Sequence, residues 1–546
     1  MNAKEIQLPF DVELLPVRKL KAGNLSCLYE AGNLRNIRSG DTEIIRMIYA
    51  AVRDENWQTI PAIISPEKIE ENENEFTIKY TAVYRTANIH YQADFSIEGK
   101  KDSSIVFSMK GEALSDFKKN RIGLCVLHPI KEYSGRKVSI TQPDGNIYDS
   151  VFPVLISPHQ PFLNVQQMNW ALDGIDVQLN FEGDIFETED QRNWTDSSYK
   201  TYSTPLYLPF PAEVKAGEKI EQRVTLEVTE NGMPQKNNPA QTIREEKIAF
   251  PKIGYCRGND PQALTNEQAQ PLNQIPFDHY RVELYLDKST WQNILSTAAT
   301  EAGLLNTKLE LITFFDDEYE KILDEFVLRL EPIKDTVSSI LLLRQNSKTT
   351  SPALMQKGYA TIKNRCPAIE IGYGTDGYFA DLNRNLPQQV TYDFVSFSLS
   401  PQVHAVDTRT LFENLERQAD TIQTLKLNLG NKKIHVSPVT LKMRRNSIAT
   451  VDERQHTFST AFWTLKCIQN LSKANRITLY ELTGDSEILS KNKSSPVYDV
   501  LKMIQAFDTI WIIKRYKNDD VIMNEFIAEN ANGERMIFES SIILNR

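Results

Sequence analysis

The chain has 546 residues, of which 41% are hydrophobic and 25% are charged, close to the averages of globular proteins. This length exceeds what one hydrophobic core usually organises, so we expect two or three domains and exclude wholesale disorder. The formal net charge of −10 repels phosphate backbones and anionic lipid headgroups, which argues against nucleic acid and membranes as partners.

The sequence contains no signal-peptide core and no run of about 18 apolar residues, so we expect a cytoplasmic protein. Its five cysteines are scattered and lack C-x-x-C spacing, which argues against a disulfide framework and a structural zinc site. The seven histidines show no metal-ligand spacing, so we expect neither a metal nor another cofactor. The alternative is a metal site whose His and carboxylate ligands come from separate strands. Whether copies of the chain form a homo-oligomer stays open.

The first half of the chain has the pattern of antiparallel strands. Apolar and polar residues alternate with period two from about residue 25 to 250, for example at 76–84, 91–97 and 222–228. Gly, Asn and Pro turns bound these runs, and sheets with one buried and one solvated face show this pattern. We predict an N-terminal antiparallel β-sandwich domain over residues 1–254.

The densest polar segment of this domain is 187–202, ETEDQRNWTDSSYKTY. Its carboxylates, arginine and aromatic rings are suited to binding sugar hydroxyls and a sugar ring face. We therefore predict substrate contacts from Glu189, Asp190, Arg192 and Trp194. The alternative is a loop that is fastened by its own ion pairs.

The second half has the pattern of a (β/α)8 TIM-like barrel. Residues 255–278 are rich in Pro, Asn and Gln and lack an apolar period, so we predict a linker there. Beyond it, seven apolar runs alternate with amphipathic stretches, which is typical of parallel strands with crossover helices. The runs are 281–286, 309–315, 340–344, 368–372, 394–398, 433–437 and 476–481.

We predict the barrel over residues 279–508, with one strand unassigned, and an open doubly wound sheet is the alternative. Residues 509–546 form a C-terminal β-segment in this prediction, packing on the barrel or joining the sandwich. The predicted fold class is therefore multidomain, α/β plus all-β.

Polar side chains follow the predicted barrel strands at their C-terminal ends, where barrel enzymes carry their catalytic residues. The candidates are Asp381, Asn383 and Arg384 after the fourth run, Gln402, His404 and Asp407 after the fifth, and Glu481 on the seventh. Two carboxylates across a pocket act as acid and base when burial raises the pKa of one of them. We predict Glu481, Asp381 and His404 as catalytic residues.

The remaining strand-end residues are predicted to bind substrate, and Asp407 is also placed to orient the ring of His404. Structural interpretations stay open for each candidate. Glu481 could pair with a lysine, Asp381 could belong to a turn, and His404 could be satisfied within its loop. The sequence lacks a G-x-S-x-G elbow, a P-loop, a G-x-G-x-x-G fingerprint and H-E-x-x-H, which disfavours serine esterases, NTPases and nicotinamide dehydrogenases.

Several stretches together resemble the D-apionate lactonases, bacterial enzymes of branched-pentose catabolism that hydrolyse D-apionolactone to D-apionate. The stretches are 46–60, 123–129, 187–206, 381–384, 400–407 and 480–484, and the most specific piece is EDQRNWTD. The resemblance extends from about residue 20 to the end of the chain. Two positions depart from the family pattern, because Asp381 replaces a Glu and Asp485 replaces a Trp.

The resemblance implies a hydrolase that opens a small sugar lactone. In this hypothesis Glu481 or His404 takes a proton from water, while Asn383 and Arg384 stabilise the oxyanion. The second hypothesis is a glycoside hydrolase, with Glu481 as nucleophile and Asp381 as acid. The third is a non-catalytic carbohydrate-binding protein with a degenerate barrel.

Overall fold

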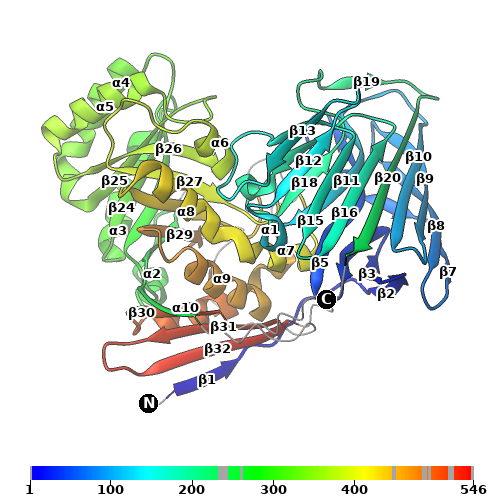
Figure 1. Cartoon of the computed structure of the whole chain (residues 1–546). Coiled ribbons are helices and arrows are strands. Elements are labelled where there is room, and N and C mark those ends of the chain that lie inside the picture. Colours follow the sequence, from blue (N-terminus) through cyan, green and yellow to red (C-terminus); the bar gives the residue numbers. More distant parts are fainter. Residues whose placement is uncertain are drawn as a thin grey trace. The chain divides into compact units, whose positions relative to one another are not determined.

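The computed structural model describes residues 3–231, 244–258, 262–444, 451–482, 488–489, 494–514 and 522–542, so Gly484 and Asp485 lie outside the described residues. The chain divides into two compact units (Figure 1). The sandwich unit contains Leu14–Arg192 and Ser197–Ala240, and the barrel unit contains Met1–Glu13, Asn193–Asp196 and Gln241–Leu544. Within the described residues, no helix is long and apolar enough to cross a bilayer.

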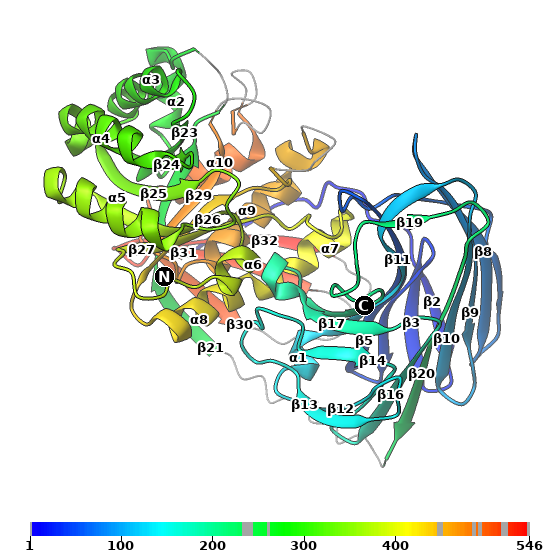
Figure 2. The same cartoon turned by 90° about the horizontal axis from the view of Figure 1, so that it is seen from above.

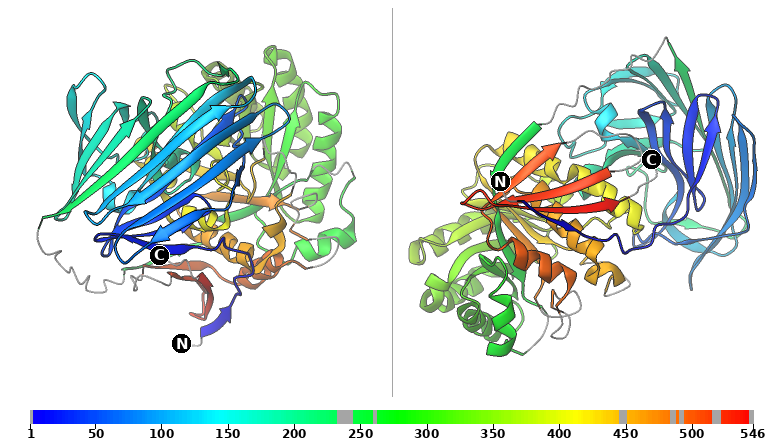
Figure 3. Two further views of the ribbon diagram at one scale, coloured as in Figure 1. Left: turned by 90° about the vertical axis from the view of Figure 1, so that its right-hand side faces the viewer. Right: turned by 90° about the horizontal axis from the view of Figure 1, so that it is seen from below.

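The sandwich unit consists of two antiparallel sheets (Figure 3, left), which confirms the predicted architecture. The ten-stranded sheet has the order β13 (Ile147–Val151), β12 (Lys137–Thr141), β15 (Gln167–Leu172), β16 (Ile175–Glu182), β20 (Lys219–Glu230), β10 (Ser104–Ala113), β9 (His90–Gly99), β8 (Phe76–Arg85) and β6 (Ala62–Ile64), with β7 (Lys68–Glu71) also on β8. The other sheet has the order β14 (Phe162–Val165), β17 (Phe186–Asp190), β18 (Ser198–Tyr202), β11 (Phe117–Pro129), β5 (Thr42–Asp54), β4 (Asn33–Ser39), β3 (Leu25–Glu30) and β2 (Arg18–Ala22), with β19 (Ala212–Val214) on β11.

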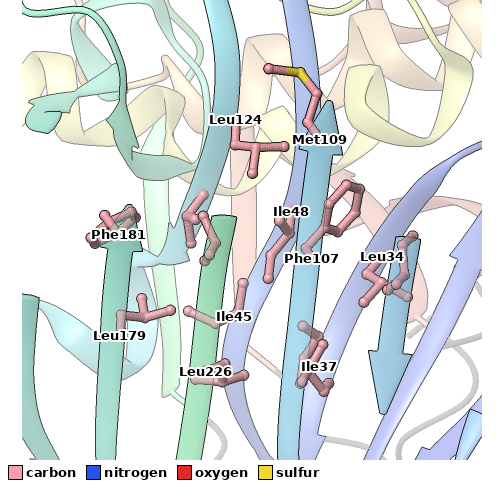
Figure 4. Close-up of a cluster of buried hydrophobic side chains, with 14 of the residues drawn as sticks. Leu34, Ile37, Ile45, Ile48, Phe107, Met109, Leu124, Leu179, Phe181 and Leu226 are labelled. Carbon is pink, nitrogen blue, oxygen red and sulfur yellow. The ribbon is translucent and has the colours of Figure 1, made fainter. Parts of the chain in front are cut away.

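The inward faces of both sheets form one apolar core (Figure 4). Leu34 and Ile48 of one sheet and Phe107 and Leu226 of the other are fully buried in it. The period-two pattern of the sequence produces this core, because alternate side chains of a strand face the same side. Each such side chain contributes roughly 1.5–3 kcal/mol of hydrophobic stabilisation.

The barrel unit contains a closed barrel of eight parallel strands, which confirms the predicted TIM-like fold. The strands are β22 (Lys252–Cys256), β23 (His279–Tyr285), β24 (Lys308–Phe315), β25 (Val337–Arg344), β26 (Glu370–Tyr378), β27 (Phe394–Leu399), β28 (Lys433–Val439) and β29 (Arg476–Glu481). The strand that the sequence left unassigned is β22, which pairs with both β23 and β29. The sequence pattern did not reveal this strand, because its five residues directly follow the alternating pattern of the sandwich.

The predicted linker 255–278 is therefore wrong at its start, since Cys256 still belongs to β22. The same segment also contains helix α2 (Asn266–Leu272), whose N-terminus carries a capping box between Thr265 and Gln268. The sequence predicted a linker here because the helix has only two buried residues, too few for a clear apolar period.

Helices outside the strands complete the barrel, and Figure 2 shows α3, α4 and α5 beside β23, β24 and β25. The longer ones are α3 (Trp291–Leu304), α4 (Tyr319–Leu330), α5 (Pro352–Arg365), α8 (Gln418–Leu429), α9 (Phe458–Asn470) and α10 (Pro496–Ile504), and the shorter ones are α6 (Phe379–Arg384) and α7 (Thr408–Glu413). Helix α4 buries Leu323, Phe326, Val327 and Leu330. This spacing of three and four residues is that of one apolar helix face.

A five-stranded sheet joins the two ends of the chain, in the order β1 (Ala3–Gln7), β32 (Arg535–Ile542), β31 (Ile522–Glu529), β30 (Thr509–Lys514) and β21 (Arg244–Ala249). Figure 3, right, shows β1 beside β32. The predicted sandwich boundaries 1–254 are therefore wrong at both ends. The C-terminal segment packs on the barrel, because Lys466 and Gln469 of α9 donate to the carbonyls of Glu525 and Trp511.

A buried carboxylate connects strands near the N-terminal end of the barrel. Glu310 of β24 accepts hydrogen bonds from Ser437 Oγ at 2.7 Å and Thr478 Oγ1 at 3.1 Å, and its Oε1 lies 3.1 Å from His435 Nδ1. Burial acts to raise the pKa of Glu310, but neighbouring His279 and His435 outweigh it and hold this pKa well below its usual value. The contacts tie β24 to β28 and β29 across the barrel interior.

Glu310→Gln is expected to lower the free energy of unfolding by about 3–5 kcal/mol at neutral pH, because it removes one partner from a buried charged network. A carboxylate with a depressed folded pKa contributes stability above its unfolded pKa of about 4.3 and loses it as the pH falls further. The difference from wild type should therefore be constant above about pH 5 and shrink below about pH 4. Urea unfolding across pH measures this, with the exposed Glu320→Gln as control, and equal stability of the two variants would contradict it.

Candidate active site at the mouth of the barrel

Four charged side chains form a closed ring at the C-terminal end of the barrel strands. Arg281 and Glu283 come from β23, Asp376 from β26, and Arg444 from the loop after β28. Arg281 donates to Glu283 Oε1 at 2.6 Å and to Asp376 Oδ1. Arg444 donates to Asp376 Oδ1 at 2.8 Å and also to Glu283 Oε1. Each guanidinium thus joins both carboxylates, which fixes the four groups relative to one another.

Arg281 and Asp376 form the buried pair of this ring. The side chains of Arg281 and Asp376 are each 2% exposed, whereas Glu283 and Arg444 are about one-quarter exposed. Burial acts to lower the pKa of Arg281, but the carboxylates of Glu283 and Asp376 outweigh it and raise this pKa above its usual value. Among the described residues, Arg281 Nε has no hydrogen-bond partner. A buried donor of this kind suits a water or a ligand oxygen.

Glu481 reaches the same place because of an irregularity in β29. Leu479 pairs with Tyr255, but the next residue of β22, Cys256, pairs with Glu481. The extra residue is Tyr480, which has a φ of 34°. Such a bulge adds one residue to one strand and re-aims the side chains that follow it.

The thiol of Cys256 lies near several charged side chains at this end of the barrel. The charges of Arg281, Arg444, Glu481 and Glu283 all act on it, but burial dominates and raises the pKa of Cys256 to about 12. The thiol therefore stays protonated at neutral pH and is a poor nucleophile. Cys256 pairs with Arg281 on one side and with Glu481 on the other, so Glu481 lies two strands from the charged ring on the same face of the barrel.

A second polar group includes residues that precede β18 in the sequence but belong to the barrel unit. Asp196 Oδ2 lies 2.5 Å from His404 Nδ1, and Asp196 Oδ1 accepts a hydrogen bond from Asn414 Nδ2 at 2.9 Å. The ring of Trp194 lies edge-on to His404 and to Tyr378, with centroid distances of 5.8 and 6.0 Å. The imidazole is thus oriented by a carboxylate that is itself held in place.

Two residues after β26 join this second group, and a third lies against β26 itself. Asn383 Nδ2 donates to Asn193 Oδ1 at 3.0 Å, and the guanidinium of Arg384 lies 5.6 Å from the centre of the Trp194 ring. Asp381 lies against β26, since a Cβ atom at Gly377 would be 2.5 Å from its Oδ2. β26 also carries Asp376 of the charged ring and Tyr378 of the second group, so both groups line the same end of the barrel.

The structure gives two other predicted residues structural contacts. Asp407 caps helix α7 by accepting a hydrogen bond from the backbone N–H of Thr410. The carboxylate that lies at Nδ1 of His404 is that of Asp196. Gln402 donates to the carbonyl of Leu441 at 2.9 Å and to Asp452 at 2.6 Å, which holds its loop to the next one.

The predicted sugar-binding segment divides between the two units. In the sandwich unit, Arg192 and Asp190 form a fully buried two-bonded ion pair, and Glu189 pairs with Lys200 at 2.5 Å. These contacts are those of a segment fastened by its own ion pairs. Only Trp194 of the four predicted residues lies in the barrel unit, beside His404.

Sequence reasoning missed the charged ring. The available signal was charge at inward positions of a buried strand, as in Arg281-Val-Glu283, because charged residues are rarely buried without a purpose. The bulge at Tyr480 left no signal. Among the described residues, no group of three or more His, Cys, Asp or Glu side chains is arranged to hold a metal ion.

Comparison with known proteins decides the family. The model of the D-apionate lactonase N-terminal domain matches residues 10–231, and that of the D-apionate lactonase TIM barrel domain matches residues 253–509. The chain belongs to the D-apionate lactonase family. The resemblance stated from the sequence is thereby confirmed, and family membership makes the chain a hydrolase.

One curated member, a D-apionate lactonase of Brucella anthropi, is 28% identical over 451 residues, which cover 78% of this chain and 73% of that one. Two solved structures resemble the chain more distantly. A family 39 glycoside hydrolase from Bacteroides cellulosilyticus WH2 covers 73% of this chain and 85% of its own at 9% identity, with a TM-score of 0.36. A family 51 α-L-arabinofuranosidase from Bifidobacterium longum covers 54% and 84% at 8% identity, with a TM-score of 0.38.

Arg192→Lys is expected to destabilise the protein, because an ammonium cannot reproduce the fork that binds Asp190 and the carbonyls of Pro153 and Val154. We expect a loss of about 2–4 kcal/mol. Thermal unfolding measures it, with Arg223→Lys at a half-exposed side chain as control. If both variants melt like wild type, Arg192 does not fasten this segment.

Proposed function

We propose that this protein hydrolyses the ring ester of a sugar lactone, with D-apionolactone as the first substrate to test. Family membership and the D-apionate lactonase of Brucella anthropi support this substrate class. The observation that supports the chemistry is the strand pairing, because Cys256 pairs with Arg281 on one side and with Glu481 on the other. Glu481 is thereby two strands from Arg281, which shares two carboxylates with Arg444.

In this proposal Glu481 is the general base. A carboxylate beside the reacting carbonyl takes one proton from a water molecule while the water oxygen attacks the carbonyl carbon. The attack opens the C=O double bond and leaves a negative charge on its oxygen. Arg281 and Arg444 replace Asn383 and Arg384 as the proposed stabilisers of this charge, because fixed guanidinium groups need no reorganisation when the charge develops.

His404 is the general acid of the second step. The tetrahedral intermediate collapses, the ring C–O bond breaks, and the leaving alkoxide takes a proton from the imidazolium that Asp196 orients. Glu481 then releases its proton to solvent and His404 takes one up, which restores both groups. One water is consumed, and the products are a hydroxyl group and a carboxylic acid, which ionises at neutral pH. Trp194 and Arg384 are proposed to contact the sugar carbons and hydroxyls near this imidazole.

Asp381 is not needed for this chemistry, and we propose that it positions β26 or a substrate hydroxyl. Asp381 lies in α6, which directly follows β26, and β26 is three strands from β29 around the closed barrel.

We also propose that the protein works in the cytoplasm on this small sugar-derived molecule. All five cysteines are buried and none is in a disulfide, as in proteins of reducing compartments.

Glu481→Gln is expected to lower kcat for D-apionolactone by about 10²–10⁴-fold, because the amide keeps the shape of the side chain but accepts no proton. The rate of acid release measures lactone hydrolysis, and Glu320→Gln on the exposed face of α4 should keep the wild-type rate. Aryl glycosides are assayed in parallel. Their cleavage, with lactones untouched, would favour the glycoside hydrolase hypothesis, and turnover of neither substrate would favour the carbohydrate-binding one.

Asp196→Asn tests the proposed acid. The amide cannot stabilise an imidazolium as a carboxylate does, so kcat should fall by about 10²-fold or more while KM changes little. Steady-state kinetics measure the split, with Asp324→Asn on α4 as the matched control. A raised KM with normal kcat would instead assign Asp196 and His404 to substrate binding.

A further inference from the structure

We propose that Tyr480 is a positioning residue whose hydroxyl, anchored on helix α9, keeps Glu481 turned into the mouth of the barrel. This inference rests on the proposed function, in which Glu481 is the base. It assigns a role to a residue that touches no substrate and acts only through its neighbour.

The strand has two alternative registers at this point. Side chains of a strand alternate between its two faces, so a regular β29 with Arg476 and Thr478 inward would also turn Tyr480 inward and Glu481 outward. The observed bulge exchanges them, because Glu481 instead of Tyr480 pairs with Cys256. A shift of one residue thus decides whether a carboxylate or a phenol enters the mouth.

The outward position of Tyr480 is held by a specific hydrogen bond. Its side chain is fully buried, and its hydroxyl lies 2.8 Å from Thr464 Oγ1 of α9. Thr464 has one hydroxyl proton, which it donates to the carbonyl of Thr460 at 2.8 Å. Tyr480 is therefore the donor and Thr464 Oγ1 the acceptor.

The anchor needs a partner that does not move, and α9 is held at both ends. Asp11 accepts hydrogen bonds from the backbone N–H groups of Phe458 and Ser459 at its N-terminus, each at 2.9 Å. Near its C-terminus, Lys466 and Gln469 bond to the five-stranded sheet. The bulge also places Tyr480, which has a side chain, at positive φ, a conformation that persists only where surrounding contacts enforce it.

Three variants test the anchor. Tyr480→Phe and Thr464→Val each remove one hydroxyl, and both should lower kcat for the lactone by about 10–100-fold with KM within about twofold, because small misplacements of a reacting group are costly. Thr464→Ser keeps the acceptor and should restore most of the rate. In a Glu481→Gln background, Tyr480→Phe should cause no further loss, since Tyr480 acts through Glu481.

The matched control is Tyr498→Phe, which removes a buried tyrosine hydroxyl bonded to the carbonyl of Pro271 and should leave kcat unchanged. A kcat for Tyr480→Phe equal to that of the control would overturn the proposal. If the wild-type protein hydrolyses no lactone, the proposed function fails separately. A crystal structure of Tyr480→Phe then decides the anchor alone, because a Glu481 turned away from Cys256 supports it and an unchanged Glu481 refutes it.

Discussion

The pairing of β22 with both β23 and β29 is the interaction on which the candidate active site depends. It closes the barrel, so the ends of all eight strands meet around one mouth. It also creates the bulge, because the extra residue of β29 is defined against the short β22. Without this closure, Glu481 would have no fixed relation to the arginines of the ring, and the proposed hydrolysis would lose its proposed base.

The charges at the mouth are arranged before any substrate arrives. Arg281 and Arg444 each contact the same two carboxylate oxygens, so neither guanidinium is free to rotate independently. Preorganised charges of this kind stabilise a transition state without reorganising during the reaction. At the other end of the barrel, Glu310 and His435 belong to a similar buried network that connects β24 with β28 and β29.

The most specific sequence motif of the family, EDQRNWTD, serves two purposes in the structure. Its Asp190 and Arg192 fasten the segment within the sandwich unit, while Trp194 and Asp196 belong to the barrel unit and hold His404. One short segment thus combines an internal ion pair with a part of the candidate site. The sequence predicted substrate contacts for residues of both kinds, because a local pattern of polar and aromatic residues does not distinguish them.

The sequence by itself determined the sandwich, the barrel, the family, and the presence of polar residues behind the barrel strands, because period-two and strand-helix patterns are local. It also pointed to Glu481, His404 and Trp194. Only the tertiary structure decided that Asp196 orients His404 at Nδ1, that Arg281 and Arg444 meet over two carboxylates, and that β1 pairs with β32. These contacts join residues far apart in the chain, and no local pattern encodes a partner or the direction in which a bulged strand turns its side chains.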